Sequence, residues 1–323
     1  MIITLTPNPS LDRTIELRAP LARGEVQRAG SSHEEPGGKG VNIVRALVAS
    51  DVPSLAILPG DGLDPVLVAL RAAGVPHLGM AIGATIRSNI ALTENDGTTT
   101  KVNVPGPVLS AAQQSELIEL VLHKAEGADW LVLAGSLPPG VPVDFYAAIT
   151  RELRSRFGAH APKVAVDSSG APLAAAVTAG PDLIKPNAEE LAELTGLPDP
   201  DSLEGDPVLV ARAAQRLVAT GVGAVLATLG SKGAVLVTKD GAWLAQTPPM
   251  VAVSTVGAGD SALAGFLLST IAGDTAPESL RQAAAHGAAA ASLPGSTVPA
   301  LHQTRPGDVT LTLLNTHPKE DVQ

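Results

Sequence analysis

Ser254-Thr255-Val256-Gly257-Ala258-Gly259-Asp260-Ser261 is the stretch around which the rest of the chain is organised. It follows an alternating, strand-like segment at 250–253 and opens an apolar run with helical periodicity. Gly257 and Gly259 allow a tight turn whose backbone N–H groups point together at a helix N-terminus, and such a turn binds phosphate. Asp260 places a carboxylate inside this anion site. A base that must approach a phosphate-transfer centre would need that position, so Asp260 is the candidate catalytic residue.

Two other interpretations of this stretch are open. Gly257-x-Gly259-x-x-Ala262 also fits the dinucleotide-binding fingerprint, but that motif belongs after an early strand and here it comes late in 323 residues. Dinucleotide binding is therefore disfavoured. In the other interpretation Asp260 only caps the helix after a glycine-rich turn, and no ligand is needed.

The composition of the chain excludes several classes of function. Of the 323 residues 45% are hydrophobic and only 2% aromatic, which predicts one large α/β domain with an aliphatic core. A net charge of −10 argues against nucleic acid and anionic membrane as partners. The absence of cysteine excludes disulfides, thiol catalysis and cysteine-based zinc sites. No signal-peptide pattern or membrane-spanning apolar run occurs, so a cytoplasmic protein is predicted.

From residue 110 onward, apolar strand patterns alternate regularly with helical patterns. Strands alternating with helices indicate βαβ units and a parallel sheet with right-handed crossovers. The carboxyl ends of parallel strands are where such a sheet binds its ligands, and polar motifs follow successive strands here. These motifs are Gly135-Ser136-Leu137-Pro138-Pro139-Gly140, Asp167-Ser168-Ser169 and Lys185-Pro186-Asn187-Ala188-Glu189-Glu190.

The first hundred residues predict a second, smaller sheet. Short, partly polar strand patterns occur at 14–17 and 26–29, and Asn95-Asp96-Gly97 is a strong hairpin signal. The glycines of Pro36-Gly37-Gly38-Lys39-Gly40-Val41-Asn42 let backbone and ammonium approach a ligand closely, which favours a ligand loop over a flexible surface loop. Arg87, just before the hairpin, can also be interpreted as a solvated charge on a strand edge.

These motifs together resemble those of the ribokinase-like (pfkB) carbohydrate kinases over nearly the whole chain. Gly37-Gly38-Lys39-Gly40-x-Asn42 resembles the N-terminal signature of the family, and Thr255-Val256-Gly257-Ala258-Gly259-Asp260 resembles its C-terminal signature. Lys185-Pro186-Asn187-x-x-Glu190 and Thr228-Leu229-Gly230-x-x-Gly233 resemble its nucleotide-side motifs. Four motifs in this order are far more specific than any one of them.

The resemblance implies an α/β fold with a ribokinase-like three-layer αβα core, a mostly parallel sheet and a small β-sheet lid. The kinase domain is expected over residues 1–301, with the lid strands within about 13–30 and 86–104. Residues 302–323 are expected to form a peripheral C-terminal segment. The lid often mediates dimerisation in this family, and unpaired strand edges favour pairing, so a homodimer through the lid is predicted.

The resemblance also implies the reaction. The stretches 6–12, 135–140 and 254–261 look most like the branch that transfers phosphate from ATP to the 6-hydroxyl of fructose 1-phosphate, with Mg²⁺. Ser254 supports this branch because many other sugar kinases have Asp there. Kinases of tagatose 6-phosphate or fructose 6-phosphate are alternatives within the family. A non-catalytic sugar-phosphate sensor is the alternative from another class, and the intact Asp260 favours the enzyme.

The roles of the candidate residues follow from this resemblance and from the chemistry of phosphoryl transfer. Asp260 would accept the hydroxyl proton, while the amides of Gly257, Ala258 and Gly259 stabilise the transferring group. Glu190, with Asn187, would hold Mg²⁺ through water. Nucleotide-binding candidates are Lys185, Asn187, Thr228, Gly230 and Gly233.

Nine residues are candidates for binding the sugar phosphate. Asp12 and Asn42 would take sugar hydroxyls, and the basic residues of the set would hold the phosphate of the substrate. Ser136 can equally be interpreted as the cap of a turn. The set comprises Asp12, Arg28, Gly37, Gly38, Lys39, Asn42, Arg87, Asn89 and Ser136, of which Lys39, Arg87 and Arg28 are the basic members.

Overall fold

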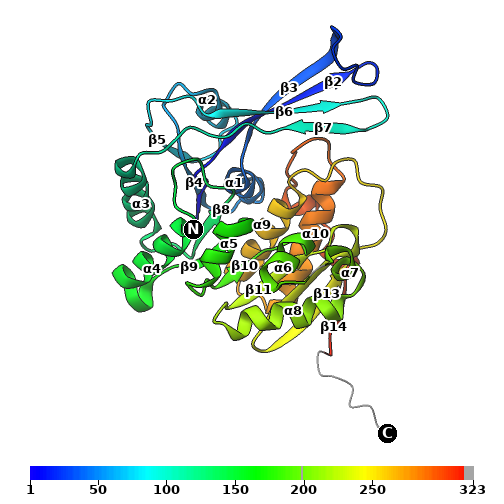
Figure 1. Cartoon of the computed structure of the whole chain (residues 1–323). Coiled ribbons are helices and arrows are strands. Elements are labelled where there is room, and N and C mark those ends of the chain that lie inside the picture. Colours follow the sequence, from blue (N-terminus) through cyan, green and yellow to red (C-terminus); the bar gives the residue numbers. More distant parts are fainter. Residues whose placement is uncertain (198, 316–323) are drawn as a thin grey trace.

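A ten-stranded sheet forms the middle layer of the computed structural model, which describes residues 1–197 and 199–315 (Figure 1). The strands lie in the order β14-β13-β12-β11-β10-β9-β8-β1-β4-β5. Those from β11 to β5 run parallel, whereas β12, β13 and β14 pair antiparallel. Their bounds are β1 (Ile2–Leu5), β4 (Ser54–Pro59), β5 (His77–Met80), β8 (Trp130–Ala134), β9 (Lys163–Asp167), β10 (Leu183–Ile184), β11 (Ala224–Thr228), β12 (Ala234–Thr238), β13 (Gly241–Gln246) and β14 (Thr310–Leu313).

Helices cover both faces of this sheet. On one face pack α1 (Lys39–Ala49), α9 (Ala258–Ile271) and α10 (Ala276–Ala291). On the other pack α3 (Ala111–Ala125), α4 (Phe145–Phe157), α5 (Gly170–Val177), α6 (Ala188–Thr195), α7 (Pro200–Gly205) and α8 (Pro207–Ala219). A smaller apolar cluster joins α2 (Pro65–Ala72) to α1 and β4. None of the described helices is long and apolar enough to cross a membrane.

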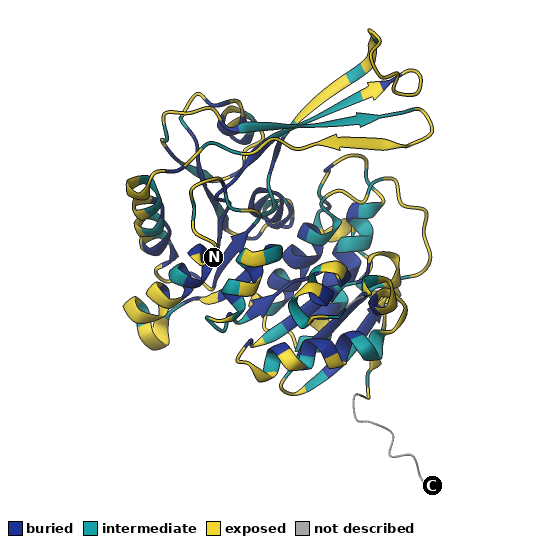
Figure 2. Cartoon of the chain, viewed as in Figure 1, coloured by how far each residue is buried: buried dark blue, intermediate teal, exposed yellow. Residues whose placement is uncertain are grey.

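The two apolar clusters of the core follow the alternation of side chains along each strand. Ile2 of β1 packs among the residues of α1, α9 and α10, whereas its neighbour Ile3 packs among those of α3 to α8. Parallel strands covered on both faces are apolar throughout, and Trp130 to Ala134 is buried at every position (Figure 2). The predicted three-layer architecture with a mostly parallel sheet is confirmed.

A second sheet of four strands, the lid sheet, projects from the core as a ribbon (Figure 1). Its order is β3-β2-β6-β7, with bounds β2 (Ser10–Leu17), β3 (Ala29–Gly37), β6 (Arg87–Thr93) and β7 (Thr99–Val102). The sequence predicts a strand at 26–29, but β3 starts where that strand was expected to end. Its run Ser31-Ser32-His33-Glu34-Glu35 is polar on both faces, which hides a strand from period-two analysis.

Two other segments differ from the sequence-based expectation. Residues 250–253 are not a strand, and Val251 is 92% exposed. Pro248 and Pro249 precede them without N–H groups, and the edge of β13 that such a strand would join is already paired with β14. Residues 310–313, in the expected peripheral segment, form that edge strand, so residues after 301 take part in the core sheet. The domain boundaries themselves stay a prediction, and residues 316–323 lie outside the described part.

Candidate active site

The first turns of α1 and α9 bring Asn42 and Asp260 together at the carboxyl edge of the parallel strands. The two helices pack against each other, and Asn42 Nδ2 donates to Asp260 Oδ2 at 2.9 Å. Asp260 is only 8% exposed. Residues 218 positions apart in sequence thus form one unit, in which an amide holds the carboxylate that was predicted to be the base.

The N-terminus of α9 forms a positively polarised turn around this carboxylate. Gly257 is the N-cap residue in the left-handed conformation with φ 74°, and no side chain caps the helix. A Cβ at Gly259 would lie 3.2 Å from Lys185 Nζ, so the ammonium sits directly over the first turn. Free backbone amides next to an ammonium suit a phosphate group, and the anion site at this turn stays a prediction.

Asp167 was predicted to lie in a polar motif after a strand without a role of its own, and in the structure it pairs with the basic residues of this site. It ends β9 and is fully buried. Its Oδ1 lies 2.6 Å from Lys39 Nζ, and its Oδ2 lies 3.1 Å from Lys185 Nζ. The available signal was its place as the first polar residue after an apolar strand. From the sequence alone, an Asp at that position is equally typical of a turn.

Burial and neighbouring charge act on these groups in opposite directions. Burial raises the pKa of Asp167, but Lys185 and Lys39 outweigh it and hold that pKa below its ordinary value. Burial would lower the pKa of Lys39, yet Asp167 and then Glu190 raise it above the usual range. Burial, followed by the charge of Asp167, raises the pKa of Asp260 to about 6. A carboxyl with a pKa raised in this way suits the role of general base that the sequence predicts for Asp260.

The predicted sugar-binding residues of the lid sheet form a second cluster. Asp12 and Asn89 are register partners on β2 and β6, and Asn89 Nδ2 donates to Asp12 Oδ1 at 3.0 Å. Ser10 Oγ donates to the same oxygen at 2.7 Å. A Cβ at Gly37 would lie 2.1 Å from Asp12 Oδ2, so a glycine is required where β3 passes this carboxylate. Polar acceptors and donors held this way can bind hydroxyl groups.

The basic residues Lys39 and Arg87, predicted to hold the substrate phosphate, have different partners in the structure. Lys39 Nζ is engaged by Asp167 and lies 3.9 Å from Glu190 Oε1, on the nucleotide-side motif. Arg87 donates to the backbone oxygens of Asn8 at 3.2 Å and Val104 at 3.1 Å. Burial lowers the pKa of Arg87, and Asp12 partly offsets this. A shared phosphate site for Lys39 and Arg87 stays a prediction.

Arg28 and Ser136 occupy different ends of the predicted substrate region. Arg28 precedes β3 at Ala29, whose partner is Leu17, whereas Gly37 at the other end of β3 pairs with Ser10. Eight residues of strand span about 26 Å, so Arg28 lies at the far tip of the lid sheet. Ser136 Oγ accepts a hydrogen bond from Asn8 Nδ2 at 3.2 Å, beside the backbone that Arg87 holds. Asn8 was not among the predicted residues.

The nucleotide-side motifs form the start of α6 and the end of β11. Asn187 Oδ1 accepts from Glu190 N at 2.8 Å, and Glu190 Oε2 accepts from Asn187 N at 2.9 Å, which makes a capping box. Asn187 also bridges to Thr228 at the adjacent strand end. A pocket of about 400 Å³ adjoins Asn187 and Glu190. At Gly233 a Cβ would lie 2.1 Å from Ala245 O, and Gly230 has φ 54°, so both glycines shape the β11–β12 connection.

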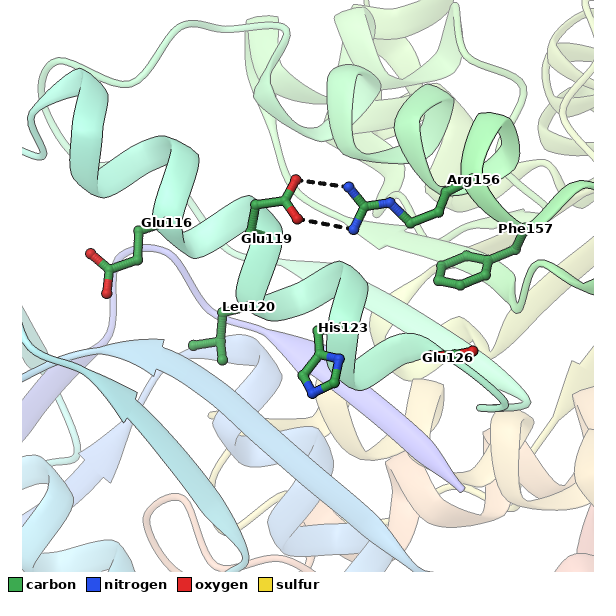
Figure 3. Close-up of a pocket in the computed structure, with 7 residues that line it drawn as sticks. All are labelled: Glu116, Glu119, Leu120, His123, Glu126, Arg156 and Phe157. Atoms are coloured by element: carbon green, nitrogen blue, oxygen red, sulfur yellow. Dashed lines mark hydrogen bonds and ion pairs between the residues drawn. The ribbon is translucent and has the colours of Figure 1, made fainter.

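A larger pocket lies elsewhere, on the outer surface between α3 and α4 (Figure 3). It measures about 530 Å³ and is lined by Glu116, Glu119, Leu120, His123, Glu126, Arg156 and Phe157. Arg156 makes a two-point ion pair with Glu119 at 2.8 and 3.0 Å. The helices α3 and α4 cover the face of the sheet opposite α1 and α9, and no predicted site residue lines this pocket. This pocket therefore lies apart from the candidate site.

The family model for pfkB family carbohydrate kinases matches residues 6–303. The chain belongs to the pfkB family of carbohydrate kinases. It is 36% identical over 272 residues to a 1-phosphofructokinase of Xanthomonas campestris, covering 82% of both chains. It is 33% identical over 303 residues to an ATP-dependent 6-phosphofructokinase isozyme 2 of Mycobacterium tuberculosis, covering 91% of this chain and 85% of the relative.

A solved structure supports the same placement. Phosphofructokinase-2 from Escherichia coli, in complex with potassium, superimposes with a TM-score of 0.84 at 29% identity, covering 94% of this chain and 96% of that one. The predicted family and ribokinase-like fold class are confirmed, and the chain is a phosphotransferase of the carbohydrate kinase type. The roles of the individual site residues stay predictions.

Proposed function

We propose that this pfkB-family kinase transfers the γ-phosphate of ATP to the 6-hydroxyl of fructose 1-phosphate, giving fructose 1,6-bisphosphate. The observation that carries the chemistry is the buried Asp260 carboxylate, held by Asn42 in an uncapped, lysine-covered helix N-terminus. The choice of sugar is supported by the relatives named 1-phosphofructokinase. A reaction that uses ATP also favours the cytoplasmic location predicted from the sequence.

In this proposal the residues around α9 divide the work of phosphoryl transfer. Asp260 accepts the proton of the attacking hydroxyl, and Asn42 keeps the carboxylate turned toward that hydroxyl. The amides of Gly257, Ala258 and Gly259, with the ammonium of Lys185, stabilise the negative charge on the transferring phosphoryl group. Asp167 fixes where the ammonium groups of Lys39 and Lys185 lie.

The residues also fit an ATP-bound magnesium ion. In the described ranges, 1–197 and 199–315, no three or more His, Cys, Asp or Glu side chains are arranged to hold a metal. Magnesium in kinases is held mainly by phosphate oxygens and water, with one or two carboxylates, and Glu190 beside Asn187 is such a carboxylate. When bound, the ion would neutralise charge on the phosphates of ATP.

The identity of the sugar is tested by comparing kcat/KM for fructose 1-phosphate, fructose 6-phosphate and tagatose 6-phosphate. We expect fructose 1-phosphate to be preferred by at least about tenfold. A site that hydrogen-bonds a substrate hydroxyl, as Asp12 and Asn89 would, leaves its own polar groups unpaired with the wrong isomer. Equal values, or a preference for another sugar, would overturn the substrate and leave the kinase mechanism. Measurable binding without ADP release from any of them would favour a sensor.

The raised pKa of Asp260 predicts the pH dependence of turnover. Because the pKa of this buried carboxyl is about 6, kcat should fall as the pH drops below that value and the base becomes protonated. The second pKa of a sugar phosphate is also about 6, so the effect of substrate titration on kcat must be distinguished from the effect of enzyme titration. The residual activity of Asp260→Asn makes this distinction. In this variant the fall in kcat at low pH, the acid limb of the profile, should lose the part that comes from protonation of the base. An acid limb unchanged in this variant would contradict the assignment.

We propose, finally, that the protein is a homodimer formed through the lid sheet. All four residues of β7 are exposed, and an exposed strand edge is a pairing surface. The role predicted for Arg28 then requires the lid of a second chain, because within one chain Arg28 lies at the far tip. Light scattering should give a dimer that Val102→Lys on β7 disrupts. Val68→Lys on α2 replaces a similarly exposed valine and should leave the dimer intact. A monomeric wild type would refute the proposal.

A further inference from the structure

Arg45 joins three separate parts of the molecule next to the catalytic carboxylate. It lies on α1 one turn after Asn42, and its side chain is 14% exposed. Its Nη2 lies 3.4 Å from Glu35 Oε1 on β3 of the lid sheet. Its Nη1 donates to Ser296 Oγ at 3.3 Å and to Asn42 Oδ1 at 3.4 Å. The guanidinium therefore lies between the lid sheet, the turn after α10 and the residue that holds Asp260.

On the lid side, Arg45 offsets a charge repulsion at the sugar-binding strand. Glu35 is the register partner of Asp12 across β3 and β2, and two carboxylates directly opposite each other destabilise a sheet. Ser296 donates to Glu35 Oε2 from both its hydroxyl and its backbone N–H. With the guanidinium of Arg45 on the other oxygen, the position of β3 beside Asp12 becomes linked to α1.

On the catalytic side, Arg45 determines which way the Asn42 amide points. Asn42 Oδ1 faces the guanidinium, and Nδ2 faces Asp260. Turning the amide over would place its oxygen against a carboxylate and its NH₂ against a cation, and both contacts would be unfavourable. A fixed donor on Asp260 also lowers the pKa of that carboxyl, against the larger effect of burial. The contact with Arg45 thus acts on the base through Asn42.

We infer that Arg45 is a positioning residue that couples the lid sheet to the catalytic base. When Glu35 holds the guanidinium in place, Asn42 presents its NH₂ to Asp260, and the base is oriented for the substrate hydroxyl. The strand that carries Glu35 lies beside Asp12, so sugar binding and base orientation depend on the same ion pair. This inference rests on the proposed function, in which Asp260 is the base.

Arg45→Met and Glu35→Gln test the coupling from its two ends. Each should lower kcat about tenfold, the usual order for a hydrogen bond to a charged group, with the KM for ATP changed less than about twofold. Each should also move the acid limb of the kcat profile to higher pH, because loss of the Asn42 donor raises the pKa of Asp260. Arg45→Lys keeps the charge and should recover part of the activity. Arg281→Met on α10 is the matched control, since it removes another partly buried arginine and its ion pair with Glu278. It should affect unfolding temperature only.

A double-mutant cycle separates this role from a purely structural one. If Arg45 acts through Asn42, Arg45→Met should cost little further activity in an Asn42→Ala background, whereas independent residues give additive losses. Additive losses, an unmoved acid limb, or a raised KM for either substrate with unchanged kcat would overturn the inference. Asp260→Asn distinguishes it from the proposed function: if that variant keeps its kcat, the base assignment itself is wrong.

Discussion

Replacing Asp260 by Asn is expected to lower kcat by at least about 100-fold, the usual loss when a general base is removed. The amide keeps the size of the side chain and an oxygen for the Asn42 donor, but it cannot take the hydroxyl proton. ATP binding should be largely retained, because the α9 amides and Lys185 that face the phosphates remain in place. Steady-state kinetics with ATP titration would measure both quantities.

The stability of the same variant distinguishes a catalytic from a structural carboxylate. Burial and Asp167 disfavour the charged form of Asp260, so its stabilising contribution is present below its ordinary pKa and is lost as the pH rises through about 6. Asp260→Asn removes this penalty, and the free energy of unfolding at pH 7 should rise by on the order of 2 kcal/mol. A near-normal kcat together with a loss of stability would mean that Asp260 has a structural role only.

Much of the fold could be predicted from the sequence, because local patterns and tertiary structure agree in the core. The strands of the parallel sheet are short apolar runs followed by polar motifs, and helical periodicity marks the segments between them. The lid sheet was harder to read. Both faces of β3 carry polar residues, so no apolar alternation marks a strand there. The prediction of a strand at 250–253 was wrong for a different reason. These residues alternate as a strand would, but the edge of β13 is already paired with β14.

The candidate site was readable where chemistry is carried by a local motif. Glycine spacing and a carboxylate at a helix start pointed to the 254–261 stretch, and a Cβ at Gly37 would meet the side chain of Asp12. Contacts between distant segments were not readable. Lys39 was expected to hold the substrate phosphate together with Arg87 and Arg28, but its ammonium pairs with Asp167 of β9, 128 positions away in the sequence. Neither Asp167 nor Arg45 stands out without the fold, because each acts through partners on other elements.

Asp167→Asn is expected to cause a large loss of stability. It should also shift the acid limb of the kcat profile in the direction opposite to the shift expected for the Arg45 variants. It would leave two ammonium groups, those of Lys39 and Lys185, without their buried counter-charge. Removing one partner from a buried ion pair costs about 3–5 kcal/mol. Because the folded-state pKa of Asp167 lies below its ordinary value, the difference from wild type should be full at neutral pH and should shrink as the pH falls through that pKa. Chemical denaturation at several pH values would measure it.

The control for this prediction is Asp182→Asn. Asp182 pairs with Arg154 at 3.5 Å on the surface, where the side chain is 39% exposed, and it accepts from Val164 N at 2.8 Å, a bond that the Asn oxygen can keep. Its replacement should therefore cost about 1 kcal/mol or less.

The kinetic effect of Asp167→Asn is more specific than its effect on stability. The charge of Asp167 raises the pKa of Asp260, so its removal should move the acid limb of kcat below pH 6. The Arg45 variants should move the same limb upward, because they remove a donor rather than a repelling charge. An upward shift for Asp167→Asn would mean that Asp167 acts on Asp260 mainly by holding the lysines, not through its own charge.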